Sequence, residues 1–420
     1  MAVSDTTIVV RSLFSRLFST VVTAITVAVG VALVLVLLSM QSANADAFKR
    51  GTGNMHYLIT RDAGELASVL NGIYFADVPN ASIPFAEYEE LRAAYPFAWA
   101  IPTVMGDSYR GLPVMGTTSD LFTQFVPAPN TAFEFASGEV FSDTFEIVVG
   151  AKTGLVMGDS ISFTHGAPNS GSTEVHDEYA FRVVGVLETT ATPFDRAIFC
   201  SLEAAWLVHA QDRRAVEGLS GIATPDDITD TDRQITGVYA RLFTRGGGNA
   251  APAALQAIFE QIRRGGRYTI ALPADQIDNL LSIVGNINAV LVALAIAVLI
   301  SSGITLMLAL YNTMEQRRRQ IAVLRVLGAS RLRIFNLVLT ESAALGLIGA
   351  AAGFVLSLIL AQVVAAALFS ATGVVVSPDI APKSALLVIS GAVLLAMVGG
   401  IIPAATAYRT SVVQNLKPQA

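Results

Sequence analysis

Few residues of this sequence have the type and spacing that catalysis requires. Gly150-Ala151-Lys152-Thr153 is similar to part of a phosphate-binding loop, but it lacks the adjacent Gly-Lys-Ser/Thr of a Walker A motif. We therefore interpret Lys152 as a loop or helix-start residue. The histidines are not spaced as in metalloproteases, and no Ser/His/Asp catalytic triad can be assembled with them. They are His56, His165, His176 and His209. The sequence predicts no catalytic site in this chain.

One polar cluster leaves two interpretations open. His176-Asp177-Glu178, with His165 nearby, offers metal-ligand residue types on an expected hairpin. The same residues are typical of a solvated polar loop. We favour the loop and predict no metal site.

Glu341 lies near the start of a long apolar stretch. An ionisable group inside a membrane is costly unless it is paired or hydrated. By expected depth, the nearest candidate partners are Arg331, Arg333 and Arg409. Two roles stay open: an ion pair that fixes the helices, or a part in coupling or substrate passage.

The same stretch contains Gly346, Gly349 and Gly353. Gly349 and Gly353 form a small-xxx-small pattern, which lets two helix backbones approach closely. We predict that this face packs against another helix, and a helix of a dimer partner is one candidate.

The densest run of cationic residues lies between two apolar stretches. It reads Glu315-Gln316-Arg317-Arg318-Arg319-Gln320-Ile321-Ala322-Val323-Leu324-Arg325-Val326-Leu327-Gly328-Ala329-Ser330-Arg331. Leu324, Val326 and Leu327 offer an apolar face. Gly328 permits a helix stop and a turn. The pattern predicts a short amphipathic helix that binds in a groove of a partner protein.

The elements that position these residues are mainly membrane spans. Only 14% of the 420 residues are charged, against about 25% in soluble domains. The deficit falls in four apolar blocks, and each exceeds the roughly 20 residues needed to cross a bilayer. The predicted spans are residues 19–40, 279–313, 334–369 and 384–407.

A cleaved signal peptide is the alternative for the first block. Ala43-Asn44-Ala45 is similar to a small-residue cleavage site. The block is longer than the roughly 7–15 residues of a signal core, so we interpret it as an anchor.

The distribution of charge sets the expected orientation. Residues 41–280 carry 29 acidic and 16 basic side chains, a net charge of −13, whereas the remainder carries +7. Arginine-rich segments face the cytoplasm by the positive-inside rule. We expect residues 1–18, 314–333 and 408–420 in the cytoplasm, and residues 41–278 and 370–383 on the outer side of an inner membrane.

The outer segment has the pattern of an α+β domain. Short strands closed by glycine alternate with helices, and a lobe at residues 136–214 is predicted as an insertion. The single cysteine, Cys200, excludes an internal disulfide and is expected to be buried. The acidic surface argues against nucleic-acid binding. The fold class is therefore a membrane protein with four helices and an α+β extracytoplasmic domain between the first and the second.

The residues 315–331 closely resemble the cytoplasmic segment of ABC permeases of the MacB/FtsX/LolC family. Gln320 and Ala322 replace the usual Glu and Gly of that segment. Glu341 with the glycines after it resembles the family's third span, and residues 400–418 resemble its fourth-span exit. Residues 148–186 are similar to the family's extracytoplasmic lobe.

The resemblance implies a permease subunit whose partners are a cytoplasmic ABC ATPase and a second permease chain. ATP and magnesium would be bound by the ATPase, and this chain would hold no cofactor and act as no enzyme. Further expected partners are the lipid bilayer and a periplasmic adaptor, lipoprotein or substrate-binding protein. The residues expected at the ATPase interface are Glu315, Arg317, Arg318, Arg319, Leu324, Arg325, Leu327, Gly328 and Ala329.

Members of this family differ in function. In the mechanotransmission mode, closure of the ATPases moves the outer domain through long helices, for efflux, lipoprotein extraction or peptide release. The alternative is an FtsX-like switch that regulates a periplasmic enzyme and transports nothing. A third hypothesis, an outer enzyme anchored by the spans, lacks a catalytic set. The size of the outer domain favours the transporter.

Overall fold

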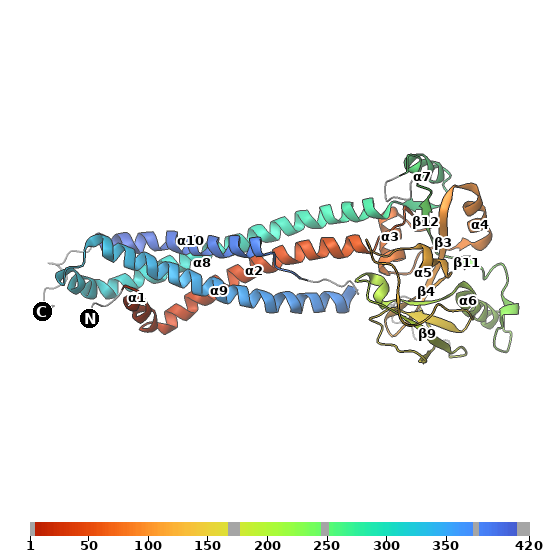
Figure 1. The fold of residues 1–420 in the computed structure, drawn as a ribbon, viewed down its shortest axis with the longest axis horizontal. Helices are drawn as coiled ribbons and strands as arrows, with labels where there is room; N and C mark the ends of the chain where they lie inside the picture. Colours follow the sequence, from red (N-terminus) through yellow and green to blue (C-terminus); the bar gives the residue numbers. More distant parts are fainter. Residues whose placement is uncertain (1–4, 167–176, 245–251, 373–377, 410–420) are drawn as a thin grey trace. The chain divides into compact units, whose positions relative to one another are not determined.

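The computed structural model describes residues 5–166, 177–244, 252–372 and 378–409. For residues 44, 46, 315, 316 and 369–372 it describes the backbone alone. Two compact units divide the chain (Figure 1). The helical unit falls within Met1–Asn44, Ile283–Ala367 and Ser377–Ala420. The α+β unit falls within Ala45–Ser282 and Leu368–Val376.

Four helices of the described residues are long and apolar enough to span a membrane. Each satisfies its backbone hydrogen bonds internally, which a bilayer requires. A shorter amphipathic helix, α1, precedes them. The helices are α1 Asp5–Phe14, α2 Leu17–Arg50, α8 Pro273–Val326, α9 Arg331–Thr372 and α10 Pro382–Arg409.

Small and β-branched side chains fill the centre of the helical unit. Val31 and Leu35 of α2 are fully buried and pack with Ala295 of α8, Ala350 of α9 and Ala392 of α10. Such residues let helices approach closely where no hydrophobic effect drives their association.

Eleven strands of the described residues form one sheet in the α+β unit, with the central order β13-β1-β12-β3-β4-β10-β6-β9-β5. β7 pairs with β9, and β8 pairs with β3. The strands are β1 Tyr57–Thr60, β3 Phe97–Tyr109, β4 Leu112–Thr117, β5 Phe135–Gly138, β6 Glu146–Val149, β7 Ser160–Ile161, β8 Thr164–His165, β9 Phe181–Leu187, β10 Ile198–Ser201, β12 Gly237–Leu242 and β13 Thr269–Ala271.

The remaining elements of this unit are a two-stranded ladder and short helices. The ladder is β2 Ile83–Pro84 with β11 Gln234–Ile235. The helices are α3 Glu65–Tyr74, α4 Phe85–Ala94, α5 Asp120–Gln124, η1 Pro193–Arg196, α6 Leu202–Val216, η2 Pro225–Asp227 and α7 Leu255–Arg264. Ser201 caps α6, since its hydroxyl accepts a hydrogen bond from the Ala204 N–H at 3.1 Å.

The segment predicted as an inserted lobe, residues 136–214, shares the sheet with its flanks. Its β10 pairs in parallel with β4 and antiparallel with β6. One buried cluster includes Ile147 and Ile198 of this segment together with Tyr57 and Ile270 of the flanks. The division into two lobes stays a prediction. Cys200 is fully buried on β10, as expected.

Candidate functional site

A tight turn joins α8 to α9. Gly328 has φ +98°, a conformation that glycine adopts without strain. The Ala329 N–H donates to the Leu324 carbonyl at 3.0 Å, and the Gly328 N–H donates to the Arg325 carbonyl at 3.1 Å. This pair of bonds is a Schellman motif. Ser330 caps α9 by accepting from the Arg333 N–H at 3.2 Å. α8 ends at Val326, just before the turn at Gly328 that the sequence predicts.

The cationic run differs in one respect from the expected short separate helix. α8 continues without a break from Pro273 to Val326, so residues 315–326 are its last turns. Residues 314–333 are called the coupling segment below. The continuity arises because helix-forming residues fill the run up to Gly328.

Side chains of the coupling segment divide between two faces. Val326 and Leu327 are 63% and 77% exposed, and Arg318 and Arg319 are also exposed. Arg325 and Ala329 are half-buried, and Ala329 packs on a cluster that includes Ile334 and Ala407. The Glu315 side chain lies outside the described residues.

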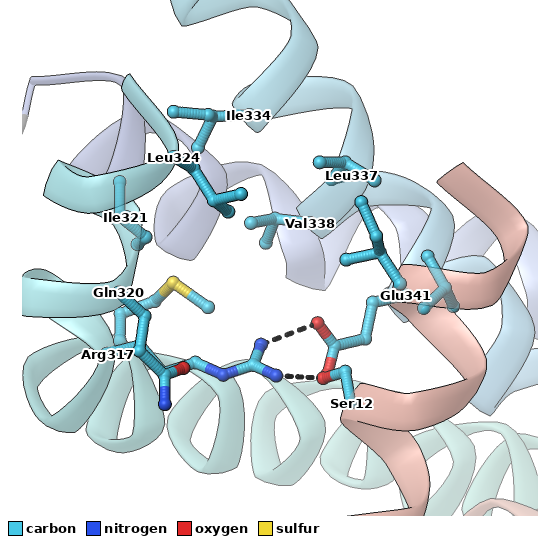
Figure 2. Close-up of a pocket in the computed structure, with 12 residues that line it drawn as sticks. Ser12, Arg317, Gln320, Ile321, Leu324, Ile334, Leu337, Val338 and Glu341 are labelled. Atoms are coloured by element: carbon cyan, nitrogen blue, oxygen red, sulfur yellow. Dashed lines mark hydrogen bonds and ion pairs between the residues drawn. The ribbon is translucent and has the colours of Figure 1, made fainter. Parts of the chain in front are cut away.

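Leu324 does not share the exposed face on which it was predicted. It is half-buried and lines a partly open cavity of about 100 Å³ between α1, α8 and α9 (Figure 2). Ile321, Leu337 and Val338 form other apolar parts of the wall. The exposed apolar surface of the segment is therefore centred on Leu327.

The polar end of this cavity holds a buried ion pair. Arg317 Nη1 lies 3.0 Å from Glu341 Oε2, and Glu341 is only 5% exposed. Ser12 of α1 donates to Glu341 Oε1 at 2.6 Å and accepts a hydrogen bond from Arg317 Nη2 (Figure 2). One cluster thus joins α1, α8 and α9.

The predicted partners of Glu341 were wrong. Arg333 pairs with Asp5 at 2.7 Å, and the Arg331 guanidinium lies 5.8 Å from the centre of the Tyr408 ring. The actual partner is Arg317, which α8 carries to the depth of Glu341 because the helix continues past the predicted span.

Sequence reasoning missed Ser12 and Asp5. Both lie in α1, which was treated as a cytoplasmic segment without assigned structure. Val9 and Ser12 are buried three residues apart on one face of this helix. In the sequence, the apolar residues Val9 and Leu13 are four positions apart, which was the available signal for a helix that packs on the bundle.

The glycine face of α9 packs within the chain. A Cβ at Gly349 would lie 2.7 Å from the Val27 Cβ, and one at Gly353 would lie 2.6 Å from the Ala28 carbonyl oxygen. Gly346 instead faces Ala396 of α10. The small-xxx-small pattern therefore lies against α2 of the same chain.

The structure places Lys152 and His165, two of the residues considered for phosphate and metal binding. Lys152 lies in a loop, where its N–H donates to the Asp195 carbonyl at 2.7 Å. His165 Nδ1 lies 3.3 Å from Asp107 and 4.0 Å from Asp212. His176 lies outside the described residues, and within them no group of three or more ligand residues is placed for a metal ion.

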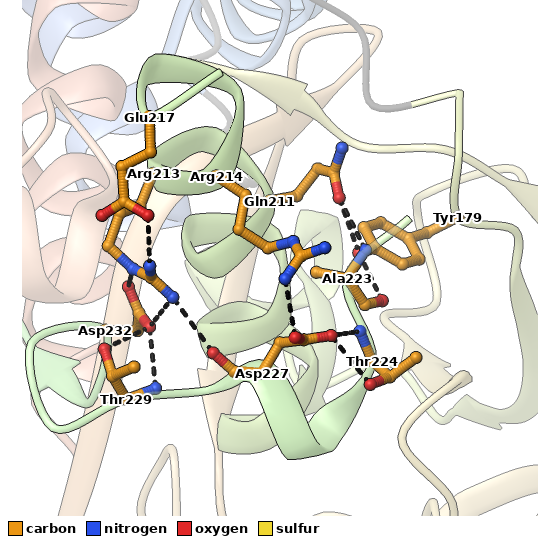
Figure 3. A network of polar contacts seen from close by, with 10 residues as sticks. All are labelled: Tyr179, Gln211, Arg213, Arg214, Glu217, Ala223, Thr224, Asp227, Thr229 and Asp232. Carbon is orange, nitrogen blue, oxygen red and sulfur yellow. Dashed lines mark hydrogen bonds and ion pairs between the residues drawn. The ribbon is translucent and has the colours of Figure 1, made fainter. Parts of the chain in front are cut away.

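A second polar network lies at the end of α6 (Figure 3). Arg213 donates to both carboxylate oxygens of Asp232 at 2.9 and 3.1 Å, and Arg214 donates to Asp227 at 2.6 Å. Burial raises the pKa of Asp232, but the bonds from Arg213 and Thr229 outweigh this effect and hold the pKa below its ordinary value. The network fastens the loop after α6 to the helix, which is a structural role.

Comparisons with known proteins agree with this architecture. The model of the MacB-like periplasmic core domain matches residues 20–258, and the model of the FtsX-like permease C-terminal region matches residues 292–412. The comparison with curated proteins found no match.

A solved structure, the extracellular domain of the noncanonic ABC-type transporter YknZ from Gram-positive bacteria, is similar at 10% identity. The match covers 51% of this chain and 98% of that one, with a TM-score of 0.27.

The first family model spans more than half of the chain, and the second covers most of the last three membrane helices. The order of span, α+β domain and three further spans is the order of these two models. The chain therefore belongs to the MacB/FtsX/LolC family of ABC-transporter permeases.

Proposed function

We propose that this permease subunit converts ATP hydrolysis by a separate cytoplasmic ATPase into movement of its α+β domain. The coupling segment and both chain ends face the cytoplasm of an inner membrane, and the α+β domain faces the periplasm. ATP and magnesium are bound by the ATPase, and two permease chains pair in the assembly. The movement serves efflux, lipoprotein transport or peptide transport.

The continuity of α8 is the observation that carries this proposal. One helix of 54 residues begins directly after β13 of the α+β unit and ends in the coupling segment. At 1.5 Å per residue it is about 80 Å long. Because no described residue breaks the helix between Pro273 and Val326, a tilt applied at one end is transmitted along it.

The exposed face of the coupling segment supports ATPase docking. Leu327 and Val326 present apolar surface, and Arg318 and Arg319, about two turns earlier on α8, are also exposed. An exposed apolar anchor at a helix end suits insertion in a groove of a partner, and the cationic side chains offer charge for further contacts.

The buried cluster supports transmission from α8 to its neighbours. Arg317 lies on the last turns of α8, whereas Glu341 and Ser12 belong to α9 and α1. Separating a buried charge from its partner is costly. Movement of α8 therefore carries α9 and α1 with it.

The test is a pair of variants with an acidic side chain at an exposed leucine. In Leu327→Asp we expect at least a tenfold loss of ATPase co-purification from detergent-solubilised membranes, because a charge replaces the apolar anchor. Leu219→Asp, at a 50% exposed leucine of the α+β unit, is the control for a surface aspartate. Equal amounts of both variants in the membrane fraction show that insertion is intact. Equal ATPase recovery with the two variants overturns the proposed docking role.

A further inference from the structure

A sharp bend between α1 and α2 places Arg16 beside the helical bundle. The Arg16 N–H donates to the Leu13 carbonyl at 3.3 Å, and α2 begins at the next residue. The guanidinium is half-buried, and its Nη2 donates to the Thr313 carbonyl of α8 at 3.4 Å. This bond is long for a charged donor.

The charges around Arg16 do not balance. Glu341 is already paired with Arg317 at 3.0 Å, and Arg16 forms no ion pair with the described residues. Burial and the neighbouring Arg317 lower the pKa of Arg16, whereas Glu341 raises it, so both charges lie close enough to act on it. Two guanidinium groups and one carboxylate leave a local charge of +1 in a half-buried place.

A small cavity lies beside this unbalanced cation. Its wall includes Arg16, Ser19, Thr20 and Thr313, with Glu341 at one side. Its volume is about 20 Å³, which is close to that of a single oxygen-sized probe. The Thr20 hydroxyl donates to the Leu13 carbonyl at 3.1 Å. The Ser19 hydroxyl has no hydrogen-bond partner among the described residues, so it is available to a ligand.

The surrounding surface fits a lipid. Three large apolar side chains at the bend point away from the bundle: Phe14 is 70% exposed, Leu17 55% and Phe18 85%. They lie at the start of the first membrane span, where acyl chains meet headgroups. A molecule that reaches Arg16 from this side has an apolar body and an anionic head.

We propose that Arg16 and the Ser19 hydroxyl bind one phosphate oxygen of an anionic phospholipid, whose acyl chains cover Phe14, Leu17 and Phe18. The lipid supplies the negative charge that the protein lacks at this position. It holds the bend between α1 and α2 against the bundle, next to the cluster of Ser12, Arg317 and Glu341.

Native mass spectrometry of the full chain tests the proposal. The protein is equilibrated in mixed micelles with either phosphatidylglycerol or phosphatidylcholine, and retained lipid is counted. We expect one phosphatidylglycerol to stay bound and Arg16→Gln to weaken it about tenfold, as for the loss of one charge-assisted hydrogen bond. Arg11→Gln is the matched control, because Arg11 is an exposed arginine of α1.

Each alternative occupant gives a distinct result. Equal retention of phosphatidylcholine shows that lipid charge is not recognised. Displacement of the lipid by inorganic phosphate indicates a site for free anions. Equal lipid retention in Arg16→Gln and Arg11→Gln shows that Arg16 binds only water. Any of these three outcomes overturns the proposal, and none depends on the ATPase.

Discussion

Arg317 and Glu341 face each other across a helical hairpin, with 3.0 Å between the guanidinium and the carboxylate. Only residues 327–330 separate the helices that carry them. Arg317 precedes Gly328 by eleven residues and Glu341 follows it by thirteen. Residues almost equidistant from the turn of an antiparallel helix pair lie side by side, so the ion pair fixes the register of α8 against α9.

Replacing only one partner of this ion pair is expected to reduce the stability of the chain more than replacing both partners. Glu341→Met leaves a buried guanidinium without a counter-charge and is expected to destabilise the chain by about 3–5 kcal/mol. The double variant Arg317→Met with Glu341→Met removes both charges and is expected to recover most of that loss. Thermal unfolding of the detergent-purified chain measures the two variants. A double variant less stable than either single variant contradicts the prediction.

The glycine face of α9 gives a second test within the bundle. Gly353→Ala brings a Cβ to 2.6 Å from the Ala28 carbonyl oxygen, which forces α2 and α9 apart. We expect a loss of about 1–3 kcal/mol, the usual cost of overpacking. Gly391→Ala is the control, because a Cβ there meets nothing within 4 Å. Thermal unfolding of the two variants compares them directly, and equal melting temperatures contradict close packing of α2 on α9.

The two leucines of the coupling segment are expected to differ, because only one faces solvent. Leu324 lines the cavity next to Ile321 and Leu337, so Leu324→Asp places a charge among apolar side chains and lowers the stability of the helical unit. Leu327 is 77% exposed, so Leu327→Asp is expected to change stability by less than about 0.5 kcal/mol. Melting temperatures separate the two effects. A large loss of stability in Leu327→Asp would place its side chain inside the bundle.

Local patterns in the sequence were sufficient to predict four membrane spans, the turn at Gly328 and the close packing of the α9 glycines against another helix. They were not sufficient for the partner of Glu341, because the predicted second span ended at residue 313 and left Arg317 in a separate segment. The nearly equal spacing of Arg317 and Glu341 around Gly328 would have identified the pair. No comparable sequence pattern indicates the ion pair of Asp5 with Arg333 or the parallel pairing of β10 with β4. Both contacts depend on tertiary packing.

The network of Figure 3 makes the stability of the α+β unit sensitive to acid. The Asp232 carboxylate has a lower pKa in the folded chain than in the unfolded one, because the bonds from Arg213 and Thr229 outweigh the opposing effect of burial. Its contribution is therefore fully present above the unfolded value of about 3.9 and is lost as the pH falls through the folded pKa. We expect Asp232→Asn to remove this contribution and to flatten the dependence of stability on pH below about 5.

Tryptophan fluorescence of the full chain measures this effect in the α+β unit alone. The protein has two tryptophans, Trp99 on β3 and Trp206 on α6, and the Trp206 indole donates to the Gln234 carbonyl at 2.8 Å. Asp230→Asn is the control, because Asp230 is fully exposed and its pair with Arg233 spans 3.7 Å. An exposed pair of this kind contributes little to stability. If Asp230→Asn and Asp232→Asn give the same pH profile of urea unfolding, the network does not tie the loop to α6.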